Sequence, residues 1–223
     1  MDKALVMLSG GLDSATCLYW AKEKGFIVSA ITFNYFGRIE KEKRATRLLA
    51  EMAGVQVIEI DVPFVKEVSD FDGAGNNGGK RRWEKEKSSD LRWESYVPAR
   101  NMMFYSIAAH YAEYLGAKWI VGGHNSQDVS FFKDASKAYI EKMNSLFAES
   151  CLLCDDGRPY QIILPLADMD RKAVITLARS LHVPIETTWS CHQGYEAPCK
   201  KCYACMQRLE AFSALGISDP ALR

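Results

Sequence analysis

Apolar residues are grouped along the chain in short, near-continuous runs. Three such runs occupy residues 3–8, 26–33 and 55–60, and two shorter ones occupy residues 119–122 and 161–164. Uninterrupted runs of this length are typical of strands in a parallel sheet, because helices cover such a sheet on both faces. We therefore predict five parallel strands.

Between these strands the apolar positions recur at helical spacing. The i, i+3, i+4, i+7 rule predicts one helix with an apolar face against the sheet from Ala45, Leu48, Leu49 and Met52. Two further helix faces are predicted, one from Met103, Ile107, His110, Tyr111 and Tyr114, the other from Val174, Leu177, Ala178 and Leu181. Strands that alternate with helices predict an α/β fold with a doubly wound, mostly parallel sheet.

Residues 69–95 differ in composition from the rest of the chain. Four glycines are followed by a charged stretch that carries Trp83 and Trp93. Residues 73–78 match the dinucleotide-binding pattern G-x-G-x-x-G, but no strand is predicted before them and no helix after them, so we do not assign that function. We predict a long loop, which serves either as a lid over an active site or as a plain surface insertion.

A Ser-Gly-Gly-Leu-Asp-Ser motif at residues 9–14 joins the first predicted strand to a helix. The start of a helix offers free backbone N–H groups and the positive end of the helix dipole, and glycines let a phosphate approach closely. The motif lacks the Gly-Lys-Ser/Thr ending of nucleotidases that cleave the terminal phosphate. We therefore predict a loop that holds the pyrophosphate released when an acid becomes an adenylate; an ordinary Gly-Gly turn is the alternative.

Individual roles can be predicted within this loop. Ser9 and Ser14 offer hydroxyl donors, and Asp13 either caps the helix or binds a magnesium ion. Asp13 and Ser14 are therefore candidate catalytic residues. The candidate ATP-binding residues are Leu8, Ser9, Gly10, Gly11, Leu12, Asp13, Ser14 and Thr16.

Four of the seven cysteines follow the spacing C-x7-C-x2-C-x2-C near the C-terminus: Cys191, Cys199, Cys202 and Cys205. Four thiolates at this spacing predict a structural, tetrahedral zinc site, and an iron–sulfur cluster is the main alternative. The odd cysteine count argues against a disulfide framework. Cys151 and Cys154 are predicted to be buried thiols at a helix end.

Length and charge limit the function further. Lysine plus arginine and aspartate plus glutamate each number 28, so no net charge attracts the backbone of a nucleic acid. The length favours one domain with a small appendage. With the motifs above, we predict an ATP-binding α/β domain at residues 1–185 and a zinc-binding region at residues 186–223 packed on it. The first apolar run is too short for a membrane span and leads into the phosphate-loop pattern, which predicts a cytoplasmic protein. We also expect a homodimer, although the sequence itself does not define the assembly.

Taken together, the motifs resemble those of the 7-cyano-7-deazaguanine synthases of the queuosine and archaeosine pathways. The resemblance rests on SGGLDSATCLYWA from Ser9, YVPARNMMF from Tyr96, Gly123 with Asp128, and TWSC from Thr188 followed by PCKKCYAC. It covers most of the chain. It implies a PP-loop ATP pyrophosphatase with an adenine nucleotide alpha-hydrolase-like fold.

The resemblance also implies a reaction, in which 7-carboxy-7-deazaguanine and ammonia become 7-cyano-7-deazaguanine at the expense of two ATP. Magnesium and zinc are the implied metals. Arg100 and Asn101 are candidates for contact with substrate or phosphate, because a guanidinium matches an anion and an amide can read a purine-like edge. Asp128 is a candidate for magnesium or for the exocyclic amine of the base, and Asp134 is a further substrate candidate. The alternatives are an N-cap role for Asn101 and a turn-stabilising role for Asp128.

One segment departs from the family pattern. Residues 130–136 read Ser-Phe-Phe-Lys-Asp-Ala-Ser, where bacterial members usually read Ser-Gly-Tyr-Pro-Asp-Cys-Arg. A different amidation or conjugation of a deazaguanine acid is therefore an alternative function. A tRNA-modifying relative is another, although thiolation would need a catalytic cysteine and a basic surface. The alternative from a different class is a zinc-ribbon module that binds nucleic acid through Lys200, Lys201 and Arg208.

Overall fold

A computed structural model describes residues 1–35, 38–63, 97–152, 159–193 and 195–222. Within these residues five parallel strands form one sheet in the order β3-β2-β1-β4-β5. The strands are β1 (Lys3–Met7), β2 (Ile27–Asn34), β3 (Val57–Asp61), β4 (Trp119–Val121) and β5 (Gln161–Ile163). All five predicted strands are confirmed. The loop predicted at residues 69–95 lies outside the described residues.

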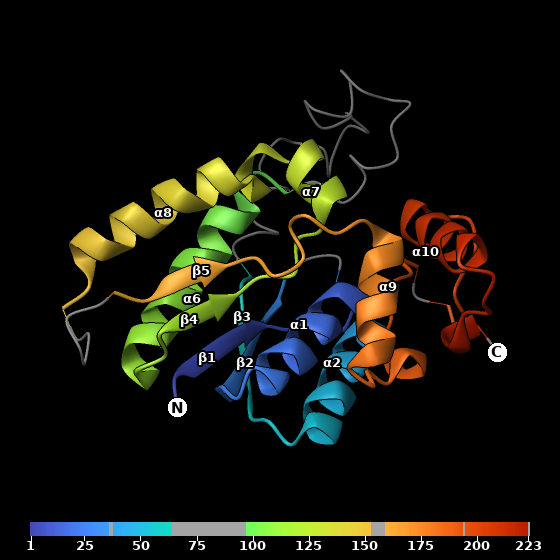
Figure 1. The fold of residues 1–223 in the computed structure, drawn as a ribbon, viewed down its shortest axis with the longest axis horizontal. Coiled ribbons are helices and arrows are strands. Elements are labelled where there is room, and N and C mark those ends of the chain that lie inside the picture. Colours follow the sequence, from blue (N-terminus) through green and yellow to red (C-terminus); the bar gives the residue numbers. More distant parts are fainter. Residues whose placement is uncertain (36–37, 64–96, 153–158, 194, 223) are drawn as a thin grey trace.

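Helices cover both faces of this sheet (Figure 1). One face carries α1 (Leu12–Glu23), α2 (Glu40–Ala53), α9 (Arg171–Ser180) and α10 (Tyr203–Ala214). The other face carries α6 (Arg100–Leu115) and α8 (Lys137–Ser150). Shorter elements are α7 (Ser126–Phe131) and the 3-10 turns η2 (Lys133–Ala135), η3 (Ile185–Thr187) and η4 (Pro220–Leu222). The doubly wound fold is confirmed, and no helix in the described ranges is long and apolar enough to cross a membrane.

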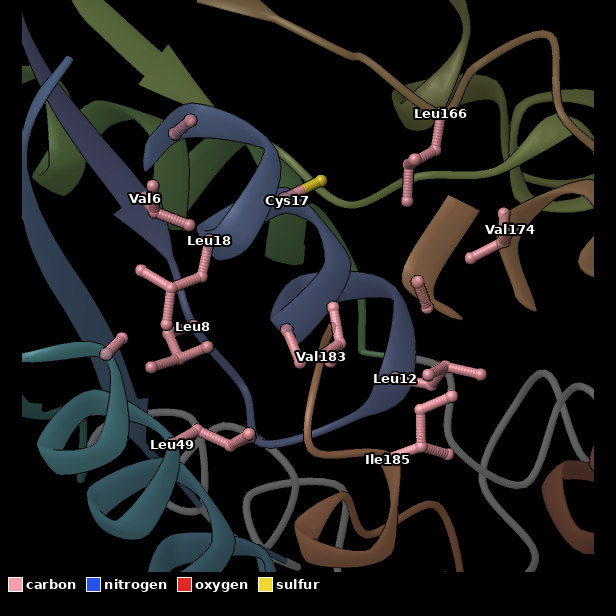
Figure 2. Packing of buried hydrophobic residues seen from close by; sticks show 14 of the residues in the cluster. Val6, Leu8, Leu12, Cys17, Leu18, Leu49, Leu166, Val174, Val183 and Ile185 are labelled. Atoms are coloured by element: carbon pink, nitrogen blue, oxygen red, sulfur yellow. The ribbon is translucent and has the colours of Figure 1, made fainter. Parts of the chain in front are cut away.

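The core is divided into two hydrophobic clusters, one on each face of the sheet. Successive strand residues point to opposite faces, so Leu5 packs with α6 whereas Val6 packs with α1. Figure 2 shows Val6 close to Leu18 of α1, with Leu49 of α2 on the same side. Phe212 of α10 belongs to this cluster too, so the C-terminal helix shares a core with the sheet.

The predicted faces of two helices differ from the observed ones. In α6 the prediction is right for Met103, Ile107 and Tyr111, which are half-buried against the core, and wrong for Tyr114, which is 80% exposed. The fully buried residues of this helix, which the prediction missed, are Asn101, Phe104, Tyr105, Ala108, Ala109 and Ala112. In α2 the prediction is right for Ala45 and Leu49, whereas Met52 is 56% exposed. The alanines on these faces let each helix approach the sheet closely, and Leu49, Phe104 and Tyr105 pack into the core beside them. Helix α7 was not predicted, and α8 was anticipated only through the helix end expected at Cys151.

The starts of α1 and α6 also differ from the predictions. Gly11 is the N-cap of α1, so Asp13 lies in the first turn and does not cap the helix. Ala99, with a left-handed φ of 53°, is the N-cap of α6, so the N-cap role considered for Asn101 is wrong. Neither Gly11 nor Ala99 has a side-chain acceptor, and the side chains of Asp13 and Asn101 do not cap these helices. Both polar side chains are therefore available for other contacts.

The end of α8 carries a further difference. Cys151 is the C-cap residue of this helix and is disulfide-bonded, so the free thiol expected at this position is wrong. Cys154, the other cysteine of that prediction, lies outside the described residues.

The strand order places a crevice at the centre of the sheet. From β1 the chain moves outward to β2 and β3 and then returns to β4 and β5 on the other side of β1. Connections that leave to opposite sides open a crevice at the carboxyl ends of the two central strands, where α/β proteins bind ligands. The Ser9–Ser14 loop follows β1, and Gly122, Gly123 and His124 follow β4, so both segments lie at this crevice.

Candidate active site and cysteine centre

A cavity of about 660 Å³ opens at the carboxyl ends of β1, β2 and β4. Its size suits a small organic ligand. The phosphate loop, the starts of α6 and α9, helix α7 and the segment at residues 189–193 all contribute to its lining. The predicted site residues that line it are Leu8, Ser9, Gly11, Leu12, Asp13, Ser14, Arg100, Asn101 and Asp128.

Hydrogen bonds within the phosphate loop hold it in one shape. The Ser14 hydroxyl accepts a bond from the Ser9 N–H at 3.2 Å and donates to the Gly11 carbonyl at 3.0 Å. The Ser9 and Ser14 Oγ atoms lie 3.1 Å apart. At the base of the loop, the Leu8 N–H donates to the Ile31 carbonyl of β2 at 2.8 Å. The loop is therefore organised before any ligand arrives.

The first turn of α1 presents backbone donors to the cavity. The first helical bond runs from the Ala15 N–H to the Gly11 carbonyl, so the N–H groups of residues 12–14 have no partner within the helix. Gly123 lies directly against this turn, because a Cβ at that position would be 3.2 Å from the Ser14 nitrogen. The missing side chain leaves the turn open to an anion.

Three predicted site residues do not line the cavity. Gly10 turns the loop toward α2 with a φ of 95°, and a Cβ there would lie 2.6 Å from the Glu42 carbonyl oxygen, so only glycine fits. Thr16 is fully buried, and its hydroxyl donates to the Leu12 carbonyl at 2.8 Å. Asp134 lies in η2, outside the lining.

Two carboxylates face the cavity close to each other. Asn125 joins them, because its Nδ2 donates to Asp13 Oδ2 at 2.9 Å and its backbone N–H donates to Asp128 Oδ2 at 3.3 Å. Asp128 thereby completes a capping box at the start of α7, so its turn-stabilising role is present. Burial raises the pKa of both carboxyls, and the charge of nearby Arg171 opposes the rise. Such a pair gains from a bound cation.

Besides Arg208, whose charge is paired with Asp219, three arginines bring positive charge to the same cavity. Arg100 is the first residue of α6, and Arg171 is the first residue of α9. An Arg171 guanidinium nitrogen lies 3.9 Å from Asp13 Oδ2, and its Nε donates to Gln127 at 2.7 Å. Arg38 is the third. The cavity therefore has the charge that a polyphosphate and a carboxylate require.

Sequence reasoning missed Arg38, which follows β2. Its guanidinium donates to the Phe33 carbonyl at 2.9 Å, to the Ser9 carbonyl at 3.1 Å and to the Thr46 hydroxyl at 2.7 Å. Burial lowers its pKa, and the Glu42 carboxylate 3.9 Å away opposes that shift. Arg38 thus ties the phosphate loop to β2 and α2. Its place beyond the carboxyl end of a strand was the signal available in the sequence.

The four C-terminal cysteines converge as predicted, with their sulfur atoms all within 4.8 Å of one another. A tetrahedral metal with metal–sulfur bonds of about 2.3 Å separates its sulfurs by about 3.8 Å, and the Cys199 and Cys205 sulfurs lie 3.9 Å apart. The Cys199 N–H donates to Cys191 Sγ, and the Lys201 and Cys202 N–H groups donate to Cys199 Sγ, which lowers the Cys199 pKa to about 6. The set fits a four-coordinate metal bound by thiolates.

The chain before this cluster is attached to the phosphate loop. The Trp189 N–H donates to the Gly10 carbonyl at 2.9 Å, and the Trp189 indole N–H donates to the Cys191 carbonyl at 2.7 Å. One residue therefore bonds to the loop and to the first cysteine. The arrangement couples the position of the cysteine centre to the back of the loop.

Arg208 is hydrogen-bonded to the same segment, on both sides of Trp189. It forms a buried pair with Asp219, with donor–acceptor distances of 2.6 and 2.9 Å, and it donates to the hydroxyls of Thr188 and Ser190 at 2.8 and 3.1 Å. Arg208 is 7% exposed. The nucleic-acid-binding alternative needed this side chain on a basic surface, and that placement is wrong.

The comparisons with known proteins cover both of these centres. The family described as "Queuosine biosynthesis protein QueC" matches residues 3–216. The chain belongs to the QueC family. Similar proteins named 7-cyano-7-deazaguanine synthase come from Trichodesmium erythraeum, 37% identical over 99% of this chain and 100% of the relative, and from Archaeoglobus fulgidus, 33% identical over 99% and 90%. The family predicted from the motifs is confirmed.

Solved structures with the same fold are more distant from this QueC-family chain. NMN synthetase from Francisella tularensis has a TM-score of 0.55 and 17% identity, and covers 97% of this chain and 78% of its own. A predicted subunit of tRNA methyltransferase from Methanocaldococcus jannaschii has a TM-score of 0.53 and 15% identity, with coverage of 98% and 90%. At these identities the likeness shows the fold alone.

Four further polar residues of the QueC-family cavity were missed by sequence reasoning: Thr32, Tyr105, His124 and Arg171. His124 is part of the Gly-Gly-His turn after β4, and Thr32 lies near the end of β2, so position relative to a strand end was an available signal. Tyr105 had been obscured by the incomplete prediction of the α6 face. No local pattern marked Arg171.

Proposed function

We propose that this QueC-family chain is an ATP-dependent ligase that converts 7-carboxy-7-deazaguanine and ammonia to 7-cyano-7-deazaguanine. Full-length similarity to proteins named 7-cyano-7-deazaguanine synthase supports the substrate. The structural observation that carries the chemistry is the first turn of α1, which Gly123 leaves open toward a cavity lined by Asp13, Asp128, Arg38, Arg100 and Arg171, among other residues. A leaving pyrophosphate needs such an arrangement of donors and charge.

The first half of the reaction forms an acyl-adenylate. A carboxylate oxygen of the substrate attacks the α-phosphorus of ATP, and the bond from that phosphorus to the β-phosphate oxygen breaks. The N–H groups of residues 12–14 stabilise the charge that develops on the pyrophosphate, and the Ser14 hydroxyl holds the loop in the shape that presents them. Because the loop's own hydrogen bonds already hold these donors, little reorganisation is needed. Arg100 orients the acid through its guanidinium fork.

The second half consumes this acyl-adenylate and then forms a second adenylate on the amide. Ammonia attacks the acyl carbon, and the bond to the AMP oxygen breaks, which gives a primary amide. The amide oxygen then attacks a second ATP, and loss of AMP together with the nitrogen-bound protons leaves the nitrile. Each nitrile therefore requires two ATP and releases two AMP and two pyrophosphates. Both adenylations release pyrophosphate, so both require the same arrangement of N–H donors in the phosphate loop.

Two metal sites belong to this proposal. Asp13 and Asp128, which Asn125 holds side by side, would bind a magnesium ion that neutralises phosphate charge. Cys191, Cys199, Cys202 and Cys205 would bind zinc, and four protein ligands close its coordination, as in a structural site. We favour zinc over an iron–sulfur cluster because no further ligand or sulfide is needed to fill a tetrahedron.

The thiolation alternative finds little support in the cavity. Cys191 is the only cysteine in the lining formed by the described residues, and it belongs to the metal cluster. Cys17 is fully buried in the core, and burial strongly raises the pKa of its thiol, which makes it a poor nucleophile.

The test is a complete reaction mixture. Purified protein with magnesium, ATP, an ammonium salt and 7-carboxy-7-deazaguanine is expected to give the nitrile by mass spectrometry, with AMP and pyrophosphate and without ADP. ADP as the nucleotide product would refute the proposal. AMP with the amide as the final product would keep the adenylation and move the endpoint, and AMP with a larger adduct would indicate conjugation.

Assembly and location complete the proposal. We expect a homodimer in the cytoplasm that takes free ammonia. Sedimentation equilibrium measures the assembly, and the rate with ammonium in place of glutamine identifies the nitrogen source.

A further inference from the structure

One part of the cavity is lined by buried polar side chains that have no hydrogen-bond partner in the part of the chain that the structure describes. Tyr105 is 0% exposed, and its hydroxyl forms no hydrogen bond. Asn101 is 8% exposed, and its side-chain amide has no hydrogen-bond partner among the described residues. The two residues are four apart in α6, so they share one face of the helix, and both line the cavity.

The strand beside α6 fixes where the Tyr105 hydroxyl lies. A Cβ on Gly122 would be 2.0 Å from this oxygen, so the hydroxyl fills the space of a side chain at the carboxyl end of β4. His124 follows two residues later, and its ring centre lies 6.0 Å from that of Tyr105. Burial, assisted by the Arg100 charge, lowers the His124 pKa to about 4. The neutral imidazole can donate one hydrogen bond and accept another.

Aromatic rings provide flat apolar surfaces in the same cavity. Phe104 of α6 stacks on Phe33 of β2 with ring centres 4.2 Å apart and planes 11° apart. Phe131 and Phe132 form an edge-to-face pair at 4.7 Å. All four line the cavity. Rings next to unpaired donors and acceptors suit a heteroaromatic base, which is stacked on its faces and hydrogen-bonded along its edge.

We propose that Tyr105, Asn101 and His124 read the polar edge of the deazaguanine base and so determine substrate specificity. This inference rests on the proposed function. Arg100 directly precedes Asn101, so a base bound along this face of α6 directs its carboxylate toward Arg100 and the phosphate loop. A site with buried, unpaired polar groups selects the ligand that pairs them and rejects analogues that do not.

The decisive variant is Tyr105→Phe, which removes one oxygen and no protein hydrogen bond. We expect its KM for 7-carboxy-7-deazaguanine to rise about tenfold, while its KM for ATP stays within about twofold and its melting temperature is unchanged or higher. Asn101→Leu, which keeps the number of side-chain heavy atoms and the branching but removes the amide, is expected to change the same KM in the same direction. Tyr160→Phe is the matched control, because Tyr160 is also buried but does not line the cavity.

The possible outcomes separate the two proposals. If the wild-type protein releases AMP with this acid but Tyr105→Phe and Asn101→Leu keep a normal KM for it, the base-reading role is wrong and the proposed function stands. A rise in the KM for ATP instead of the acid would assign these groups to adenine and overturn the inference. If the wild-type protein neither binds the acid in calorimetry nor releases AMP with it, the proposed function fails first.

Discussion

The phosphate loop and the cysteine centre are adjacent in space but are held together by different means. Ser9, Gly11 and Ser14 bond to one another, so the loop keeps its shape through the chain's own hydrogen bonds. The cysteine region has sulfur atoms at its centre and few other buried groups, and its geometry fits a metal. A loop side chain that faces the cavity, such as Asp13, can therefore be changed mainly at the cost of chemistry, whereas a residue of the cysteine centre cannot be changed without a cost in folding.

The largest effect is expected from the cysteine centre. Cys202→Ser is expected to remove the metal and to destabilise residues 189–205, since structural zinc contributes on the order of 10 kcal/mol in small sites. Elemental analysis and the melting temperature measure the two effects. Cys17→Ala is the control, because it removes a buried thiol outside the cluster and should leave the metal content unchanged. Iron in the wild-type protein, or normal folding of Cys202→Ser, would contradict the assignment.

The second effect concerns the support between the two regions. Arg208→Met leaves Asp219 buried without its partner, which is expected to cost about 3–5 kcal/mol of unfolding free energy. The pair is well shielded, with side-chain exposures of 7% and 1%. The double variant Arg208→Met with Asp219→Leu is expected to recover most of the loss, since no uncompensated charge remains. Denaturant titration of the wild type and the two variants measures the unfolding free energies. An Arg208→Met variant as stable as the wild type would show that the pair does not stabilise the fold.

The third effect is on rate alone. Asp13→Ala and Ser14→Ala are each expected to slow product formation roughly a hundredfold or more, with little change in melting temperature. Steady-state AMP release measures the rate. Ser145→Ala is a matched control, because its exposed hydroxyl donates within helix α8 far from the loop in sequence. Near-normal turnover in Asp13→Ala or Ser14→Ala would place the active site elsewhere.

The smallest effect is on pH dependence. The pKa of His124 is about 4 in the folded protein against an ordinary value of 6.5, so the unfolded chain binds an extra proton between these values. Its contribution to stability is present above pH 6.5 and is lost as the pH falls toward 4. Asp13 and Asp128 have raised pKa values, so their contribution to stability instead increases as the pH falls. The quantity to measure is therefore the difference in unfolding free energy between the wild type and His124→Asn. We expect that difference to change by about 1–2 kcal/mol between pH 7 and 5, and a constant difference would contradict the assigned environment.

The sequence predicted the parts of this molecule that are local in the chain. The residues that identify each strand, the phosphate loop and the cysteine spacing lie within one continuous segment of the sequence. Arg38 and Arg208 were not assigned their observed roles, because the contacts that define these roles reach across the chain: Ser9 lies 29 residues from Arg38, and Asp219 and Thr188 lie 11 and 20 residues from Arg208. The buried face of α6 was predicted only in part for a related reason. Alanines carry little hydrophobic signal, yet they allow the close approach that buries Tyr105.

The central seam between β1 and β4 also sets an order of events during synthesis. β1 pairs with residues 27–31 soon after they are made, but its other edge must wait for residues 119–121. At about 5–20 residues per second this wait lasts roughly 4 to 18 s, and pairings between distant segments are slow in any case. Gly123 arrives only with that second edge. A nascent chain therefore acquires its sheet on one side first, and its capacity to bind nucleotide appears late, when the last central pairing closes.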